Sequence, residues 1–193
     1  METQNKTIYD ILFKQKNIFL DIAMILCSIV FIAVMANIRI NLWPVPITMQ
    51  TFGAFTIAFF FGSRKGFLSF LAYMLAGVVG FSVFAGWKSG MAVMMGPTVG
   101  YLVGMLVAAF FVGMMIEKGY GRTKKSVLLV MVVGNLIIYS LGLIGLKMFL
   151  GEVGLVGLLM AGLIPFLIGD FLKILGAMYL FPFLWKGSEK IAN

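Results

Sequence analysis

Six apolar runs limit what this chain can fold into, because most of them approach the length of a membrane-crossing helix. A bilayer-spanning helix needs about 20 predominantly apolar residues. Hydrophobic residues make up 62% of the sequence and charged residues 11%, whereas soluble domains typically carry about 25% charged residues. The sequence therefore predicts an all-α integral membrane protein. The runs are Ile18–Asn37, Thr48–Phe61, Gly66–Phe84, Thr98–Ile116, Ser126–Phe149 and Leu155–Trp185.

We expect these runs to form one six-helix bundle. The second run, about 14 residues long, is shorter than a regular span, and the last is long enough to tilt or to extend past the bilayer. The expected single membrane domain covers residues 1–193. It divides into an N-terminal cytoplasmic segment (1–17), a substrate-binding bundle (18–185) and a cytoplasmic tail (186–193).

The basic residues predict the orientation of the bundle in the membrane. Eleven of the fifteen lysines and arginines fall on one side of the expected spans. Positively charged loops favour the cytoplasm, so we expect both termini there and an even number of spans. The basic residues form no stripe with interleaved aromatic residues, which argues against nucleic acid as a partner. The eleven are Lys6, Lys14, Lys16, Arg64, Lys65, Lys118, Arg122, Lys124, Lys125, Lys186 and Lys190.

Two unusual loops lie on the side that is poor in charge. The first, Ile38–Gln50, reads IRINLWPVPITMQ, and its prolines Pro44 and Pro46 prevent a regular helix there. The second, Phe81–Pro97, reads FSVFAGWKSGMAVMMGP and contains three glycines. Both loops are moderately apolar, so we expect them to fold back over the outer mouth of the bundle as a lid. Two ordinary surface loops with apolar tips remain the alternative.

An acid and a base lie near the middle of the last apolar run. Asp170 and Lys173 are three residues apart, so on a helix they share a face. Burying a charged residue at mid-bilayer costs about 2.5–3.5 kcal/mol on insertion scales, which favours a functional role for the pair. Two alternatives remain open. The pair could simply pack the bundle, or Lys173 could extend to the membrane surface and leave only Asp170 buried.

The surroundings of this pair favour a ligand. Gly169 and Gly176 leave that face of the helix open, and Pro165 loosens the preceding turn. An acid and a base together suit a neutral ligand whose donors and acceptors lie side by side, such as a urea or amide group. Asp170 would accept from N–H groups, and Lys173 would donate to a carbonyl or carboxylate oxygen.

Small residues elsewhere predict close helix packing. Gly100 and Gly104 are four apart in the fourth run, and Gly142 and Gly145 are three apart in the fifth. Such spacings let helix backbones approach closely. A similar pattern in the first run, Ala23 to Cys27, could face another protein.

Several functional classes lack the residues they need. The chain has no histidine and one cysteine, and it contains no phosphate-binding loop of the form G-x-x-x-x-G-K-[ST]. We therefore expect no enzyme activity, no metal site and no cofactor, and any energy for uphill transport would come from another chain. A membrane enzyme acting on lipids and a self-sufficient channel remain alternatives, although the buried acid and base favour capture of a small molecule.

Three segments carry a resemblance to a known family. They are PVPITMQTFG (44–53), SVFAG with GPTVGYL (within 82–102) and GDFLK (169–173). In order and spacing they resemble BioY, the biotin-binding S-component of energy-coupling factor (ECF) transporters. The resemblance implies a multi-pass, six-helix protein of the prokaryotic cytoplasmic membrane that binds biotin from outside. It also implies a transmembrane coupling protein and a pair of cytoplasmic ATPases as partners, besides membrane lipid. An S-component for another vitamin or small heterocycle is the alternative.

The resemblance also implies where biotin would bind. Asp170 and Lys173 would make polar contacts with biotin. Gln50 and Thr51 would belong to the lid formed by the first loop. In this chain Lys88 stands where a family member can place an asparagine that contacts the ligand. Lys88 could instead meet the valerate carboxylate or face water.

The remaining implied positions shape the pocket. Gly96, Pro97 and Tyr101 would form its mouth, and Phe84 and Trp43 would provide apolar walls around the thiophane ring. The family usually has two glycines before the tyrosine, where this chain has Val99 and Gly100.

Overall fold

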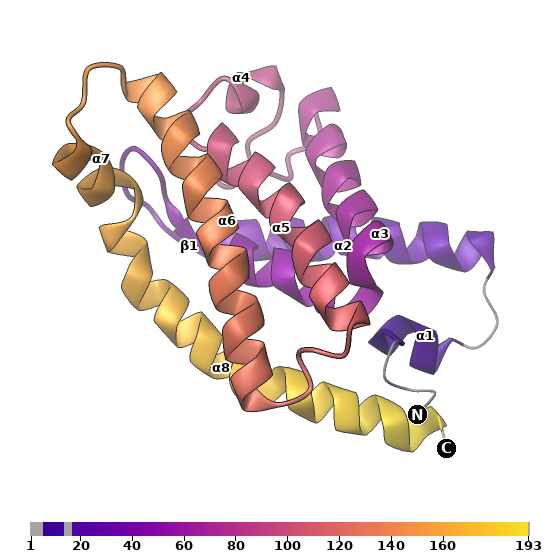
Figure 1. Cartoon of the computed structure of the whole chain (residues 1–193). Coiled ribbons are helices and arrows are strands. Elements are labelled where there is room, and N and C mark those ends of the chain that lie inside the picture. Colours follow the sequence, from indigo (N-terminus) through magenta and orange to yellow (C-terminus); the bar gives the residue numbers. More distant parts are fainter. Residues whose placement is uncertain (1–5, 14–16, 193) are drawn as a thin grey trace.

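The computed structural model describes residues 6–13 and 17–192, and within them the chain is mostly helical (Figure 1). Lys14 and Lys16, which support the expected orientation, lie outside the described residues. A two-stranded antiparallel hairpin is the only sheet within the described part of the chain. The elements are α1 (Ile8–Leu12), α2 (Ile18–Asn37), β1 (Arg39–Ile40), β2 (Ile47–Thr48), α3 (Gln50–Val79), α4 (Met91–Met94), α5 (Val99–Glu117), α6 (Lys124–Leu150), α7 (Leu155–Gly162) and α8 (Ile164–Ala192).

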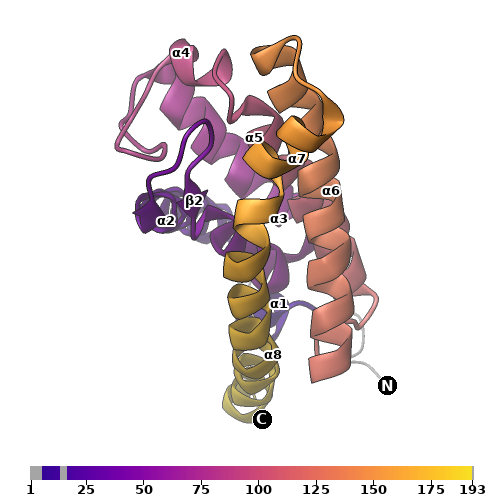
Figure 2. The same cartoon turned by 90° about the vertical axis from the view of Figure 1, so that its left-hand side faces the viewer.

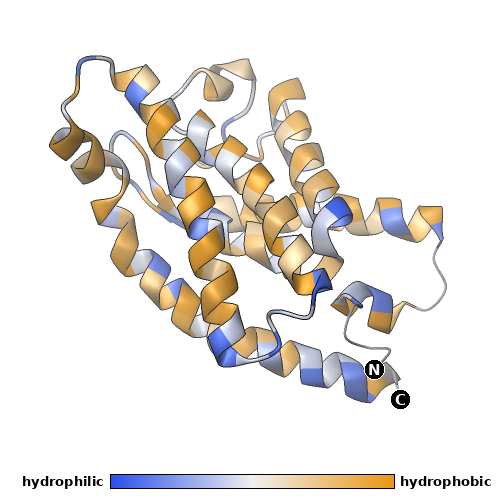
Figure 3. Cartoon of the chain, viewed as in Figure 1, coloured by the Kyte–Doolittle hydropathy of each residue, from blue (hydrophilic) through white to orange (hydrophobic). Residues whose placement is uncertain are grey.

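Four helical stretches in the described residues are long and apolar enough to cross a membrane. They are α2, α5, α6 and the combined stretch Leu155–Ile191. The first predicted run coincides with α2, and the fourth and fifth differ from α5 and α6 by one or two residues at each end. Figure 3 shows apolar residues along most of these helices, with hydrophilic residues interrupting α8 partway along its length.

The second and third predicted runs correspond largely to the two halves of α3, which are two helices joined by a sharp kink at Gly62, where φ is 80°. The connection between them is shorter than the predicted loop around Arg64, because Glu117, from the end of α5, caps the second half of α3. Its carboxylate accepts hydrogen bonds from the Ser63 backbone N–H at 2.7 Å and from the Ser63 hydroxyl at 2.8 Å. The helix can therefore restart immediately after the glycine.

The predicted end of the third run at Phe84 was also too late. The helix α3 ends at Val79, because Gly80 adopts a φ of 122° and terminates it. Phe84 therefore lies in the second loop, where it pairs with Lys88 in an isolated bridge.

The last predicted run, Leu155–Trp185, is two helices rather than one. The helices α7 and α8 meet at Leu163, whose backbone leaves the helical region. Pro165 lacks an N–H donor and its ring clashes with the carbonyl four residues earlier in a continuous helix, which accounts for a break just before it. The Gly162 carbonyl that the break leaves accepts a hydrogen bond from the Tyr101 hydroxyl at 2.7 Å.

The core forms where α3, α5 and α6 pack together (Figures 1 and 2). A Cβ atom placed on Gly100 would lie 2.5 Å from the Leu141 carbonyl oxygen and 2.9 Å from the Gly145 Cα. One placed on Gly104 would lie 2.9 Å from the Ile138 Cα. The predicted close packing of small residues is therefore confirmed for α5 and α6. Ala23 and Cys27 of α2 lie on an exposed face instead.

A polar cluster joins α1 to α2 and α3. The Tyr9 hydroxyl donates to the Asp21 carboxylate, and the Lys65 amine lies 2.6 Å from the same carboxylate and 3.9 Å from the centre of the Tyr9 ring. Burial, followed by the hydrogen bond to Asp21, raises the pKa of Tyr9 to about 12. The hydroxyl therefore stays protonated at neutral pH and continues to donate.

Candidate functional site

Asp170 and Lys173 form a buried ion pair on α8. The Lys173 Nζ lies 2.8 Å from the Asp170 Oδ1, and each side chain is 9% exposed. The alternative in which Lys173 extends to the membrane surface is therefore wrong. Lys173 also donates to the Thr51 hydroxyl at 2.9 Å, and the Tyr139 hydroxyl donates to the Asp170 Oδ2. The pair thus joins α8 to α3 and α6.

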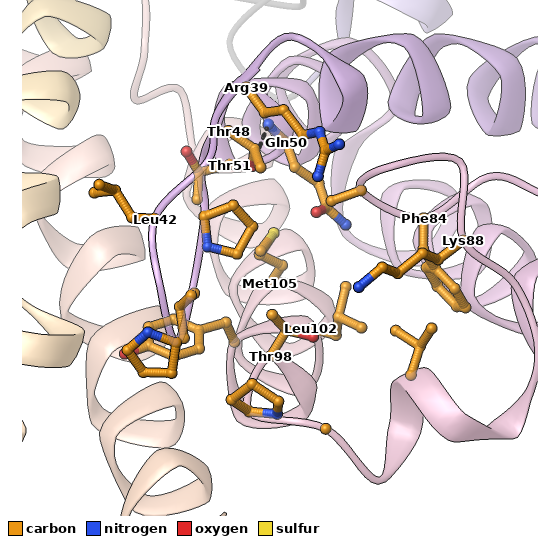
Figure 4. Close-up of a pocket in the computed structure, with 18 of the residues that line it drawn as sticks. Arg39, Leu42, Thr48, Gln50, Thr51, Phe84, Lys88, Thr98, Leu102 and Met105 are labelled. Carbon is orange, nitrogen blue, oxygen red and sulfur yellow. Dashed lines mark hydrogen bonds between the residues drawn. The ribbon is translucent and has the colours of Figure 1, made fainter.

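This pair lines a cavity of about 830 Å³. The two loops, α3, α5, α6 and α8 surround it, and the first loop enters as the β1–β2 hairpin (Figures 2 and 4). In the hairpin Arg39 pairs with Thr48, which holds the proline segment as an extended bend over the cavity. The prediction that both loops fold over one mouth agrees with this lining. The alternative in which the ion pair only packs the helix bundle does not agree with it, since the pair faces an open volume.

The structure brings together all ten residues that the sequence singled out. They come from both loops and from the helices α3, α5 and α8, although they are spread over more than half of the chain. Each of them lines the same cavity: Trp43, Gln50, Thr51, Phe84, Lys88, Gly96, Pro97, Tyr101, Asp170 and Lys173.

Two of these residues, Phe84 and Trp43, were expected to form apolar walls of the cavity, and the structure places them differently. The Phe84 side chain is 1% exposed, because its ring is wedged against Gly77 and packs edge-on against Tyr73 at 5.6 Å. Phe84 thus anchors the second loop and presents little surface to the cavity. Trp43 is 83% exposed at the outer rim.

Gln50 lines the cavity and also begins a buried polar chain that runs away from it. Its amide donates to the Tyr73 hydroxyl at 3.1 Å, and that hydroxyl donates to the Val83 carbonyl at 3.1 Å. Since Gln50 begins α3 and Val83 belongs to the second loop, this chain ties the loop to the helix that carries Thr51.

Among the further residues that line the cavity, sequence reasoning missed two whose polar groups matter for its chemistry. Tyr139 is a polar residue within the fifth apolar run, and its hydroxyl donates a hydrogen bond to Asp170. Arg39 is the only charged residue of the first loop, and its guanidinium lies against Gly86 of the second loop. Both could have been found as isolated polar residues in or beside apolar segments, which is the signal that identified Asp170.

The cavity lining carries excess positive charge. Arg39, Lys88 and Lys173 are its cationic residues, and Asp170 is its only acidic residue. Lys173 is paired with Asp170, whereas neither Arg39 nor Lys88 forms an ion pair with a carboxylate in the described part of the chain. The inner end of the cavity therefore offers a neutral donor and acceptor surface, and the outer end offers two cations suited to an anion.

The described residues do not indicate a metal centre. Within residues 6–13 and 17–192, no three histidine, cysteine, aspartate or glutamate side chains gather closely enough to hold a metal ion.

Comparison with known proteins gives consistent matches. The chain matches the BioY family over residues 5–190. It is 32% identical over 153 residues to a probable biotin transporter BioY from Pyrococcus horikoshii, covering 79% of this chain and 88% of that protein. It is 37% identical over 149 residues to the biotin transporter BioY from Thermotoga maritima, covering 76% of this chain and 84% of that protein.

A solved structure shares the fold. The crystal structure of the S-component for biotin from an ECF-type ABC transporter superposes with a TM-score of 0.72. The match covers 87% of this chain and 92% of that chain, at 24% sequence identity. The family match spans nearly the whole described chain, and the chain is therefore a member of the BioY family.

Proposed function

We propose that this protein captures biotin at the outer face of the prokaryotic cytoplasmic membrane and serves biotin uptake as the S-component of an ECF-type transporter. Membership of the BioY family and relatives named as biotin transporters support the ligand. The observation that carries the proposal is the buried Asp170–Lys173 pair facing a cavity of about 830 Å³.

Free hydrogen-bonding capacity at this pair suits the ureido ring of biotin. An ammonium group has three donors, and Lys173 uses two of them, on Asp170 and Thr51. The third is free to donate to the ureido carbonyl. A carboxylate has about four acceptor positions, and Asp170 fills two with Tyr139 and Lys173. The others can accept the ureido N–H groups, so biotin would complete the pair's hydrogen bonding.

The outer end of the cavity suits the valerate carboxylate. Lys88 and Arg39 are the two cations there without a carboxylate partner. Charge-assisted hydrogen bonds to carboxylates are among the stronger polar contacts in proteins. Biotin would thus bind with its ring beside Asp170 and its tail beneath the two loops.

We extend the proposal to topology and partners. The chain would form a single membrane domain of six spans, with both termini in the cytoplasm, and the two halves of α3 on either side of Gly62 would supply the second and third spans. The distribution of basic residues supports this orientation. Because the sequence has no phosphate-binding loop, a transmembrane coupling protein and a pair of ATPases would supply the energy.

Equilibrium binding to the purified protein tests the ligand. In detergent, labelled biotin is expected to bind at about one molecule per chain, since the described residues offer one cavity that contains a buried ion pair. Unlabelled biotin should displace the label, whereas excess thiamine, riboflavin or lipoic acid should not. Absence of saturable biotin binding, together with binding of one of these other vitamins, would assign the cavity to another ligand.

Replacement of Lys88 tests the placement of the tail. Lys88→Met is expected to weaken biotin binding about tenfold, because one charge-assisted hydrogen bond is lost. Binding of biotinamide, whose tail is uncharged, should change little. Lys125→Met, at the exposed start of α6, is the matched control and should affect neither ligand. If Lys88→Met lost the same affinity for biotin and for biotinamide, the lysine would not contact the carboxylate.

A further inference from the structure

Asn37, the last residue of α2, connects the two loops that cover the cavity. Its Nδ2 donates to the Ala33 carbonyl at 2.8 Å and to the Phe84 carbonyl at 3.3 Å. Its Oδ1 accepts from the backbone N–H groups of Gly86 at 2.8 Å and Trp87 at 2.9 Å. The first loop begins at the next residue, so Asn37 starts one loop and holds the other.

The segment that Asn37 holds is a tight turn between Phe84 and Lys88. The Phe84 N–H donates to the Lys88 carbonyl at 3.0 Å and closes the turn. Inside it, Gly86 has a φ of 81° and Trp87 a φ of 54°. A positive φ is unfavourable for a residue with a bulky side chain. The two hydrogen bonds to Asn37 hold the backbone N–H groups of these two residues, so the asparagine stabilises the strained part of the turn.

Both unpaired cations of the cavity depend on this turn. Lys88 is its last residue, and Figure 4 shows the Lys88 amine extending into the cavity from beside Phe84. The guanidinium of Arg39 packs against Gly86, where a Cβ atom would lie 2.8 Å from the Arg39 Nη1. Because Arg39 lies two residues after Asn37, the asparagine fixes the backbone on both sides of this cationic end.

We propose that Asn37 is a positioning residue that sets Lys88 and Arg39 for the carboxylate of the ligand, and so determines preference for an acid over its neutral amide. The inference rests on the proposed function, because it needs a ligand whose tail ends in a carboxylate. Asn37 does not line the cavity and acts only through the turn. An amide is suited to this role, since it donates to one carbonyl of the turn and accepts from two N–H groups at once.

The test compares two ligands on the same protein. Asn37→Ala is expected to weaken biotin binding about tenfold and to leave biotinamide binding within about twofold of wild type. The ratio of the two dissociation constants is the readout. A merely structural role for Asn37 would weaken both ligands alike and leave this ratio unchanged, and that result would overturn the proposal. Should Asn37→Ala fail to fold, Asn37→Ser, which keeps one side-chain oxygen, is measured in the same way.

A double-mutant cycle tests whether Asn37 influences biotin binding through Lys88. If Asn37 acts mainly by placing Lys88, adding Asn37→Ala to Lys88→Met should cost less biotin affinity than Asn37→Ala costs alone. Fully additive losses would overturn the positioning role toward Lys88. Failure of the proposed function would look different, because wild-type protein would then bind neither biotin nor biotinamide.

Discussion

Replacing Lys173 by methionine is expected to reduce biotin affinity by about a hundredfold. Methionine removes the donor to the ureido carbonyl and leaves the Asp170 carboxylate, whose side chain is 9% exposed, without its cationic partner. Loss of a hydrogen bond from a charged donor costs about 1.5–3 kcal/mol, and about 2.7 kcal/mol corresponds to a hundredfold in affinity. The dissociation constant for labelled biotin, measured on purified protein, checks this result.

Two controls separate a binding defect from a folding defect. The double variant Asp170→Asn/Lys173→Met removes both charges, so it should unfold at a higher temperature than Lys173→Met alone, although it still should not bind biotin. Lys125→Met, far along α6 from Tyr139, should bind normally. If Lys173→Met bound biotin with wild-type affinity, the assignment of the ureido ring to this pair would be wrong.

Placing an alanine at Gly100 is expected to destabilise the fold strongly. The new methyl group would lie 2.5 Å from the Leu141 carbonyl oxygen and 2.9 Å from the Gly145 Cα. These atoms belong to the backbone of α6, so relief requires α5 and α6 to separate. Overpacking of this kind costs about 1–3 kcal/mol or more. Thermal unfolding in detergent should therefore begin at a clearly lower temperature than for wild type.

A matched glycine on another helix provides the comparison. Gly176 is exposed on α8, and a Cβ atom there would meet nothing within 4 Å. Gly176→Ala should leave the unfolding temperature unchanged or raise it slightly, because alanine has the better helix propensity. Equal unfolding temperatures for the two variants would contradict the tight contact between α5 and α6.

Features encoded by local pattern could be predicted from the sequence. The bounds of α2 follow from a long apolar run, interrupted only by Asp21 and Ser28 and flanked by polar residues. The ion pair follows from the three-residue spacing of Asp170 and Lys173 on a helix. The close approach of α5 to α6 follows from Gly100 and Gly145, which remove the side chains that would hold the two backbones apart.

Features that depend on distant partners could not be predicted in this way. The kink of α3 at Gly62 needs the carboxylate of Glu117 to cap the restarted helix, and these residues are far apart in the sequence. The placement of the second loop needs Asn37, which reaches it across more than forty residues. Tyr139 is recognisable as an isolated polar residue, but its contact with Asp170 depends on the packing of α6 beside α8. Nothing local in the sequence specifies these contacts.

An experimental structure of the purified protein with biotin bound tests the central claim most directly. We predict the ureido ring within hydrogen-bonding distance of Asp170 and Lys173, with the carboxylate near Lys88 and Arg39 under the two loops. Biotin bound elsewhere, with the Asp170–Lys173 pair facing an empty or collapsed cavity, would contradict the account.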